Sequence, residues 1–259
     1  MTVHLRDVVA YLDTTLEIDR FKDYALNGLQ VEGAPEVDTV VCGVSANQAL
    51  FERALELDAD LIVVHHGLIW GGGIARVTGP TARRLRQLLA SDVSLAAYHL
   101  PLDKHARLGN NTGLADAIGL TLAGREAFGD VKGVALGLAG TWPVALARDE
   151  AIARIGAGVL GKRGLPFAFP YGPAQVRKVG LCTGAAGDLV EAAAAAGCDL
   201  FVTGELAERA SELARELQIS LVAAGHYATE VYGPQRIADE LRLKFPSLSV
   251  HFVGVPTPL

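Results

Sequence analysis

Asp60-Leu-Ile-Val-Val-His-His66 is an apolar run that ends in two adjacent histidines. The segment from Thr39 to His66 aligns without gaps with the segment from Lys178 to Glu205, which ends in Asp199-Leu-Phe-Val-Thr-Gly-Glu205. Both copies show the pattern of a strand, a tight turn, a helix, a short turn and a second strand. This internal repeat predicts two related α/β halves.

Short apolar runs alternate with amphipathic segments through most of the chain, which is typical of parallel strands joined by helices. The predicted fold class is therefore α/β, with two related α/β lobes and mostly parallel sheets covered by helices. We expect strands at residues 37–44, 60–64, 93–98, 134–139, 176–183, 200–203, 220–224 and 248–255. We expect helices at residues 3–17, 48–57, 81–90, 112–118, 150–159, 187–196, 207–217 and 235–244.

The two halves are predicted to form one domain over residues 1–259, because no Ser/Pro-rich linker or change of composition separates them. They cover about residues 1–121 and 174–259, and the segment 122–173 matches the repeat poorly and is expected to bridge them. A further match aligns Ala96-Ala-Tyr-His99 with Ala223-Ala-Gly-His226. Each half is thus expected to end a strand with a histidine that a carboxylate follows four residues later.

Composition favours a folded cytoplasmic protein. The uncharged stretch 133–147 contains glycines and Pro143 and is shorter than the roughly 20 apolar residues of a membrane span. The N-terminus lacks the order of a signal peptide. Three cysteines without a CxxC motif indicate a reducing compartment and packing in the core.

Several classes of function lack support in the sequence. A net charge of −6 without a run of Lys or Arg argues against direct binding of nucleic acid. The sequence has no GxxxxGK[ST] phosphate loop and no G-x-S-x-G nucleophile motif. The glycine run Gly71–Gly73 is compatible with a lid or a plain loop, and the sequence does not decide its role.

Ligand-type side chains follow four predicted strands, at His65-His66, His99 to Asp103, Glu205 and His226 to Glu230. The carboxyl ends of parallel strands are where ligands bind in α/β sheets. Each residue alone has a structural alternative, such as a hydrogen-bonded histidine, a turn aspartate or a first-turn glutamate. Their joint placement favours a metal site, and mixed imidazole and carboxylate ligands suit Zn, Fe, Mn, Ni or Co equally.

Spacing adds two expectations for the metal site. Successive residues of an extended strand point to opposite sides, so His65 and His66 are able to serve different ions of a pair. One helical turn from His226 to Glu230 would bring imidazole and carboxylate to one face.

With these residues assembled, the chain resembles the Nif3-like family of dinuclear-metal-centre proteins, also labelled GTP cyclohydrolase 1 type 2. The matching segments occur in the family's order: Asn27-Gly-Leu-Gln-Val31, Val64-His-His-Gly67, Tyr98-His-Leu-Pro-Leu-Asp103, Gly109-Asn-Asn-Thr-Gly-Leu-Ala115, Thr203-Gly-Glu205 and Gly225-His-Tyr-Ala-Thr-Glu230. They extend over almost the whole chain.

The resemblance implies two divalent metal ions per chain. The family's metal ligands match His65, His66, Asp103, His226 and Glu230. His99 matches a histidine beside the metals and is the candidate for orienting a ligand or transferring a proton, with Glu205 as a weaker candidate for proton transfer. Some relatives carry a further histidine shortly after the segment that matches Glu205, whereas residues 206–213 contain none.

The resemblance also implies a toroidal homohexamer, a trimer of dimers, without the middle domain of longer members. The expected function is that of a metal-dependent hydrolase, which uses a metal-activated water on a nucleotide, phosphoester or purine-type substrate. One alternative, which the family label suggests, is opening of a ring of GTP. The other is a non-catalytic hexamer that binds, stores or delivers metal, which the negative net charge favours.

Overall fold

The computed structural model describes residues 2–161 and 164–257, without the side chains of residues 122–125. The chain forms two compact units. Unit 1 comprises Met1–Leu102 and Gly233–Val255, and unit 2 comprises Asp103–Tyr232 and Pro256–Leu259. These bounds differ from those of the two halves predicted from the repeat, because the last strand of the chain joins the sheet of unit 1.

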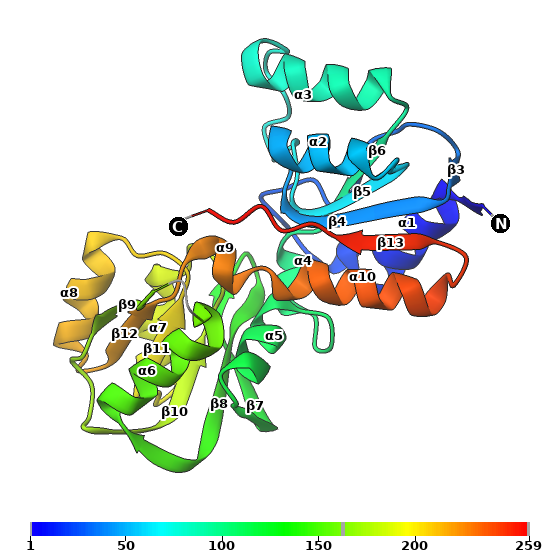
Figure 1. The fold of residues 1–259 in the computed structure, drawn as a ribbon. Helices are drawn as coiled ribbons and strands as arrows, with labels where there is room; N and C mark the ends of the chain where they lie inside the picture. Colours follow the sequence, from blue (N-terminus) through cyan, green and yellow to red (C-terminus); the bar gives the residue numbers. More distant parts are fainter. Residues whose placement is uncertain (1, 162–163, 258–259) are drawn as a thin grey trace. The chain divides into compact units, whose positions relative to one another are not determined.

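Unit 1 is built on a five-stranded sheet between two layers of helices (Figure 1). Its strand order is β13 (Ser249–Phe252), β4 (Thr39–Ser45), β5 (Leu61–His66), β6 (Ser94–Ala97) and β2 (Gly28–Val31). Only β2 runs antiparallel to its neighbour. One face carries α2 (Gln48–Glu56) and α3 (Gly79–Ala90), and the other carries α1 (Leu5–Thr15) and α10 (Tyr232–Lys244). A separate two-stranded sheet pairs β1 (Val3–His4) with β3 (Glu36–Val37).

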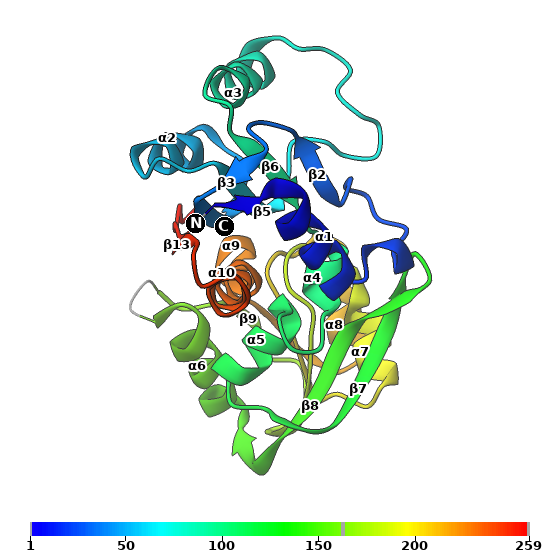
Figure 2. The same ribbon diagram turned by 90° about the vertical axis from the view of Figure 1, so that its right-hand side faces the viewer.

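Unit 2 is built on a six-stranded sheet that also lies between helices (Figure 2). Its strand order is β7 (Thr121–Val131), β8 (Val134–Ala147), β10 (Gln175–Leu181), β11 (Leu200–Thr203), β12 (Ser220–Ala223) and β9 (Phe167–Phe169). One face carries α5 (Asn110–Ala117) and α6 (Arg148–Val159), and the other carries α7 (Val190–Ala195) and α8 (Glu208–Glu216). Short helical segments in the described part of the chain include η1 (Ile18–Arg20), η3 (Gly187–Leu189), α4 (Leu100–Lys104) and α9 (His226–Thr229).

The α/β fold is confirmed, but the sheet of unit 2 is mixed rather than mostly parallel. Its strands β10, β11 and β12 are parallel, whereas β7, β8 and β9 are added antiparallel. The hairpin between β7 and β8 turns at Lys132 and Gly133, which both have positive φ, as a two-residue type I′ turn requires. The segment 122–173 thus supplies strands and a helix to unit 2, and its residues 162 and 163 lie outside the described part of the chain.

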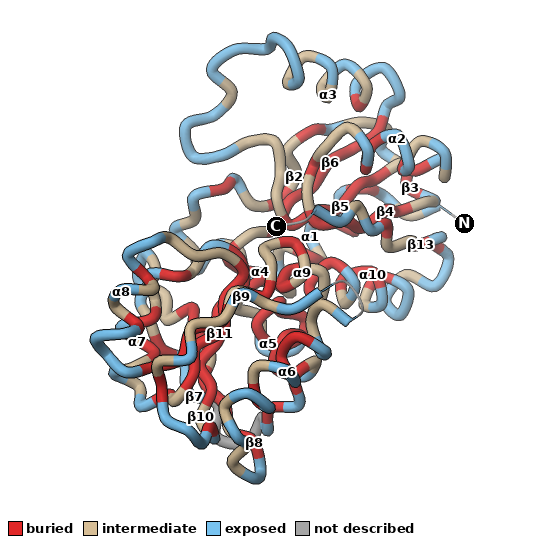
Figure 3. The backbone as a smooth tube through the Cα atoms, turned by 60° about the vertical axis from the view of Figure 1, so that its left-hand side comes forward, coloured by how far each residue is buried: buried red, intermediate tan, exposed pale blue. Residues whose placement is uncertain are grey.

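Burial explains why the predicted elements form. Buried residues follow the central strands of both sheets (Figure 3). In unit 1, Leu50 and Phe51 of α2 and Leu88 of α3 pack on apolar strand residues. All three cysteines are buried and in the thiol form. Among the described residues, no helix is long and apolar enough to cross a membrane.

The internal repeat reappears in matching hydrogen bonds. In unit 1, Asp60 Oδ2 accepts hydrogen bonds from the backbone amides of Asp38 and Thr39, at 2.8 and 2.9 Å. In unit 2, Asp199 Oδ2 accepts from the amides of Arg177 and Lys178, also at 2.8 and 2.9 Å. Each aspartate therefore ties the start of its second strand to the start of the strand before it.

A second matching pair extends the equivalence toward the N-terminal side of each copy. The amide of Gly33 donates to Ser94 Oγ at 2.9 Å, and the amide of Gly172 donates to Ser220 Oγ at 3.0 Å. Ser94 and Ser220 pair with the first residues of β5 and β11. This register makes Ala97 equivalent to Ala223, whereas the sequence alignment paired Ala96 with Ala223. Unit 2 therefore has one additional residue between the strand and His226.

We expect Asp60→Ala and Asp199→Ala each to lower the free energy of unfolding by about 1–3 kcal/mol, because each leaves two backbone amides without their acceptor. Chemical denaturation of the full chain measures both effects. Glu216→Ala, at an exposed site, is the control and should change stability by less than about 0.5 kcal/mol. A negligible cost at either aspartate would contradict the structural equivalence.

Candidate metal centre

In unit 1, three histidines meet at the carboxyl edge of the sheet. His65 and His66 end β5, and His99 follows its parallel neighbour β6. The ring centroids of His65 and His66 lie 4.4 Å apart, and those of His65 and His99 lie 5.2 Å apart. One nitrogen from each ring lies within 4.8 Å of the other two. Although neighbours in a strand point to opposite sides, these rings converge where the strand ends.

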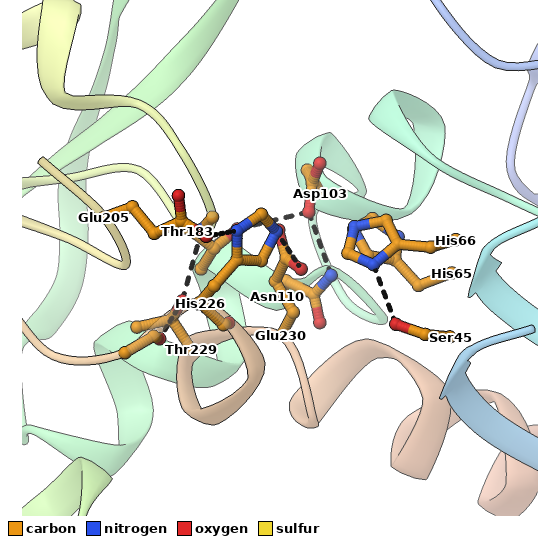
Figure 4. Close-up of polar contacts among 12 residues, drawn as sticks. Ser45, His65, His66, Asp103, Asn110, Thr183, Glu205, His226, Thr229 and Glu230 are labelled. Carbon is orange, nitrogen blue, oxygen red and sulfur yellow. Dashed lines mark hydrogen bonds and ion pairs between the residues drawn. The ribbon is translucent and has the colours of Figure 1, made fainter. Parts of the chain in front are cut away.

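Hydrogen bonds at Nδ1 fix how these rings point. His65 Nδ1 lies 2.9 Å from the carbonyl oxygen of Tyr98, which only accepts, so Nδ1 carries the proton and Nε2 the lone pair. His99 Nδ1 lies 2.7 Å from Asp23 Oδ1, which likewise places a proton on Nδ1. Histidines that bind metals are commonly oriented by such an acceptor on the other ring nitrogen. His66 Nδ1 contacts Ser45 Oγ at 3.1 Å (Figure 4).

Asp23 organises the loop that carries His99. Its carboxylate accepts hydrogen bonds from His99 Nδ1, Asn27 Nδ2 and the amides of Ala25 and Leu100. Burial raises the pKa of Asp23, but these hydrogen bonds and the His99 charge outweigh burial and lower the pKa to about 2. The ionised form of Asp23 is therefore the one that the folded chain stabilises.

Asp23→Ala should destabilise the full chain by about 2–3 kcal/mol at neutral pH, because several donors lose a charged acceptor. The pKa of Asp23 falls from 3.8 to about 2 on folding, so its contribution is complete above about pH 4 and is lost as the pH falls toward 2. Denaturation of wild type and variant over this range measures the difference. Exposed Asp19→Ala is the control, and a difference that does not shrink in acid would contradict this role.

In unit 2, the predicted helical turn brings His226 and Glu230 together. Gly225, at φ +92°, turns the chain from β12 into α9, and His226 Nε2 then lies 3.1 Å from Glu230 Oε2. On its other side, His226 Nδ1 lies 2.5 Å from Glu205 Oε1. Glu205 follows β11, the parallel neighbour of β12, so both residues come from the carboxyl edge of the sheet.

The two carboxylates also set the charge of His226. Burial lowers its pKa, but the hydrogen bonds and charges of Glu230 and Glu205 raise it to about 9. Without a metal the ring is therefore cationic at neutral pH. A divalent ion would take the place of the proton on Nε2, while Glu205 continues to accept from Nδ1.

Asp103 in α4 is a further candidate ligand in unit 2. It is buried, and its Oδ1 accepts hydrogen bonds from Asn110 Nδ2 at 2.9 Å and from Thr183 Oγ1 at 3.1 Å (Figure 4). A carboxylate oxygen of Asp103 lies within 4.8 Å of one of Glu230, which is also buried. Two buried carboxylates at this separation repel each other unless a cation lies near them.

Gly184 leaves the space that Glu230 occupies. It follows β10 at φ +68°, and a Cβ at this position would lie 2.2 Å from Glu230 Oε1. Its carbonyl oxygen accepts hydrogen bonds from the amides of Gly204 and Glu205 and from Thr203 Oγ1. Glycine at this position is thus required both by the backbone conformation and by the carboxylate.

The structure brings the predicted residues together within each unit. Unit 1 groups His65 and His66 with His99, since one nitrogen of each ring lies within 4.8 Å of the other two. Unit 2 groups Asp103, His226 and Glu230, with Glu205 behind His226. The residues that hold these side chains were not predicted from the sequence: Ser45, Asp23, Asn110, Thr183 and Gly184. Asn110 falls in a segment that matches the family, and Ser45, Thr183 and Gly184 fall in the aligned copies of the internal repeat.

The donor sets suit a divalent metal. Each unit presents imidazole nitrogen or carboxylate oxygen atoms from strand ends, and a hydrogen-bond acceptor at Nδ1 orients His65, His99 and His226. Such mixed sets bind transition metals and zinc. The residues present therefore fit metal ions of the kind that the sequence predicted.

Known proteins similar to this chain have the same fold. The family model of Duf34/NIF3 (NGG1p interacting factor 3) matches residues 3–258. A Pseudomonas aeruginosa protein named "GTP cyclohydrolase 1 type 2 homolog" is 41% identical over 258 residues and 100% of both chains. An Archaeoglobus fulgidus protein with the same name is 39% identical over 99% of this chain and all of its own.

Solved structures agree with the sequence relatives. The structure titled "protein ybgI, unknown function" has a TM-score of 0.91 at 35% identity and covers 99% of this chain and 100% of its own. The structure of a Thermus thermophilus protein, TTHA1606, has a TM-score of 0.87 at 34% identity, with the same coverage. The chain belongs to the Duf34/NIF3 family.

Proposed function

We propose that the protein binds two divalent metal ions per chain. The ligands in this proposal are His65 and His66 of unit 1 and Asp103, His226 and Glu230 of unit 2. The observation that carries it is the shared design of the histidines: His65 and His226 each have Nδ1 against an oxygen acceptor, which leaves Nε2 for a metal. The buried carboxylates Asp103 and Glu230 support it, because a cation would offset their repulsion.

We further propose that the metal ions serve hydrolysis of a nucleotide, phosphoester or purine-type substrate. When bound, they would lower the pKa of a water molecule and stabilise negative charge that develops on the substrate. The chain's own residues hold the metal ligands in place and transfer protons. Glu205 keeps the His226 ring in place through Nδ1, and Asn110 and Thr183 keep the Asp103 carboxylate in place.

His99 is the proposed proton carrier. Asp23 fixes its Nδ1, so Nε2 is the atom that accepts or returns a proton. Its side chain is 15% exposed, so a substrate is able to reach it. The alternative is that His99, which lies close to His65 and His66, is itself a metal ligand. In that case His99→Ala will lose metal as well as activity.

Turnover by metal-loaded protein on a panel of phosphoesters, nucleotides and purines tests the hydrolase proposal. Glu230→Ala should abolish both metal binding and turnover, whereas His99→Gln should lower turnover and retain metal. Absence of turnover across the panel, with metal bound, would overturn the hydrolase and favour the alternative of a protein that binds or delivers metal. The name of the relatives adds GTP to the panel, with formate release as the readout of ring opening.

Self-assembly into a toroidal homohexamer in the cytoplasm remains part of the proposal, from the family resemblance. Light scattering on the untagged full chain measures the mass of the assembly, and a monomer at micromolar concentration would overturn it.

A further inference from the structure

Unit 2 contains a cavity of about 590 Å³ at the carboxyl ends of β11 and β12. Small-molecule sites have volumes of roughly 300–1,000 Å³, and they occur at this edge of α/β sheets. Small residues line one side of the cavity: Gly204, Ala223, Ala224, Gly225 and Ala228. The space exists because each of these residues carries at most a methyl group.

Comparison with unit 1 shows that such a space is not a general feature of the fold. By strand register Ala97 is equivalent to Ala223, so Tyr98 is equivalent to Ala224. Tyr98 is fully buried, and its hydroxyl donates to Asp13 at the end of α1. In unit 1 the phenol ring of Tyr98 thus fills the space between the end of β6 and helix α1.

In unit 2 the corresponding position holds only the methyl group of Ala224. The cavity there extends to Leu160, the residue that follows α6. Helix α6 precedes the antiparallel edge strand β9, as α1 precedes β2 in unit 1. The cavity therefore occupies a place that the other copy of the repeat fills with its own side chain.

The cavity has an apolar wall and one acidic side chain. Leu165 and Phe167 line it although they are 87% and 78% exposed, so large apolar surface borders its opening. Exposed apolar surface beside a concave site is one of the marks of a ligand-binding groove. Among the described residues that line it, Glu205 is the ionisable one, and its Oε1 contacts His226.

This combination selects a class of ligand. The apolar wall fits a ring. A carboxylate at the edge of an apolar cavity pairs best with a cationic group that donates two N–H hydrogen bonds, such as an amidine. An anionic group in the same place would face Glu205 Oε2, since Oε1 already contacts His226. The ligand's polar end would lie next to His226, whose Nδ1 contacts the same carboxylate.

We propose that this cavity binds a small molecule with an apolar ring and an amidine or amine group, with the N–H donors on Glu205 and the ring between Ala224 and Phe167. We expect this ring and its N–H donors to be the part of the substrate that places the reacting group beside His226. This role of the small molecule rests on the proposed function. Binding itself involves only residues that line the cavity and requires no metal.

Saturation-transfer NMR on the full chain, with benzamidine and benzoate as probes, tests the proposal. The two probes have the same ring and opposite charge. We expect benzamidine to bind both metal-free and metal-loaded protein and to bind at least about tenfold more tightly than benzoate. Equal binding of both probes, or no binding of benzamidine, would overturn the proposal.

Variants locate the probe. Ala224→Tyr copies the side chain that fills the space in unit 1, and Ala228→Leu fills the cavity from α9 in case the first variant does not fold. Either should abolish benzamidine binding, and Glu205→Gln should weaken it about tenfold. Exposed Ala195→Leu on α7 is the control and should bind as wild type.

The outcomes separate this proposal from that of the metal centre. Benzamidine binding that persists in Ala228→Leu or Glu205→Gln would place the probe elsewhere and overturn the cavity proposal, whatever the metal content. Binding that follows the variants in a protein without metal would support the cavity proposal while the proposed function fails.

Discussion

Gly184→Ala should cost about 4 kcal/mol of stability and lower metal affinity about 100-fold or more. Two causes add. The residue has φ +68°, where a side chain costs about 1–2 kcal/mol, and its Cβ would lie 2.2 Å from Glu230 Oε1. Glu230 is buried, so its carboxylate moves away from His226 or the backbone of Gly184 shifts. Denaturation and metal titration of the full chain measure the two effects.

Gly197→Ala is the matched control. Gly197 has φ +72° in the same unit, and nothing lies within 4 Å of a Cβ added there. It should cost about 1 kcal/mol and leave metal affinity unchanged. The difference between the two variants isolates the contact with Glu230. Equal effects of the two substitutions would show that Gly184 serves the backbone alone.

Removal of bound metal should lower the free energy of unfolding by about 4 kcal/mol when free metal had been about 1,000-fold above its Kd. The physical reason is the pair of buried carboxylates, Asp103 and Glu230, whose oxygens lie within 4.8 Å of each other. Without metal, the cationic His226 ring lies against Glu230, and a divalent ion would offset the charge of both carboxylates more fully. Thermal unfolding before and after chelation, and after metal is restored, measures this difference.

Glu230→Gln should lose most of this dependence on metal, since one of the two charges is gone. The control is Glu191→Gln, at an exposed site on α7, which has the same net charge as Glu230→Gln. It should respond to chelation as wild type does. A Glu230→Gln protein that metal stabilises as strongly as wild type would contradict the assignment of Glu230.

The strands that carry a strongly apolar run of their own could be predicted from the sequence. The run at Asp60–His66 is strongly apolar and has a copy at Asp199–Glu205, so β5 and β11 were predicted with their place in a parallel sheet. The antiparallel strands β2, β7 and β9 were missed. Two of them are short edge strands, and β7 carries charged residues, so their pairing depends on the neighbouring strand more than on their own pattern.

The site was predictable in its ligand types but not in its supporting contacts. His65, His66, His99 and His226 stand at strand ends, which the sequence shows. Asp23 is 76 residues from His99, and Thr183 is 80 residues from Asp103, so no spacing in the sequence connects them. Gly184 is informative only once its φ and its contact with Glu230 are known.

Elemental analysis of the untagged full chain, purified without added metal, tests the central claim most directly. We expect about two metal ions per chain in the wild type and loss of metal in both His65→Ala and Glu230→Ala, one variant from each unit, while exposed Glu191→Ala keeps the wild-type content. No stoichiometric metal in the wild type, even after reconstitution, would contradict the claim and return these histidines and carboxylates to structural roles.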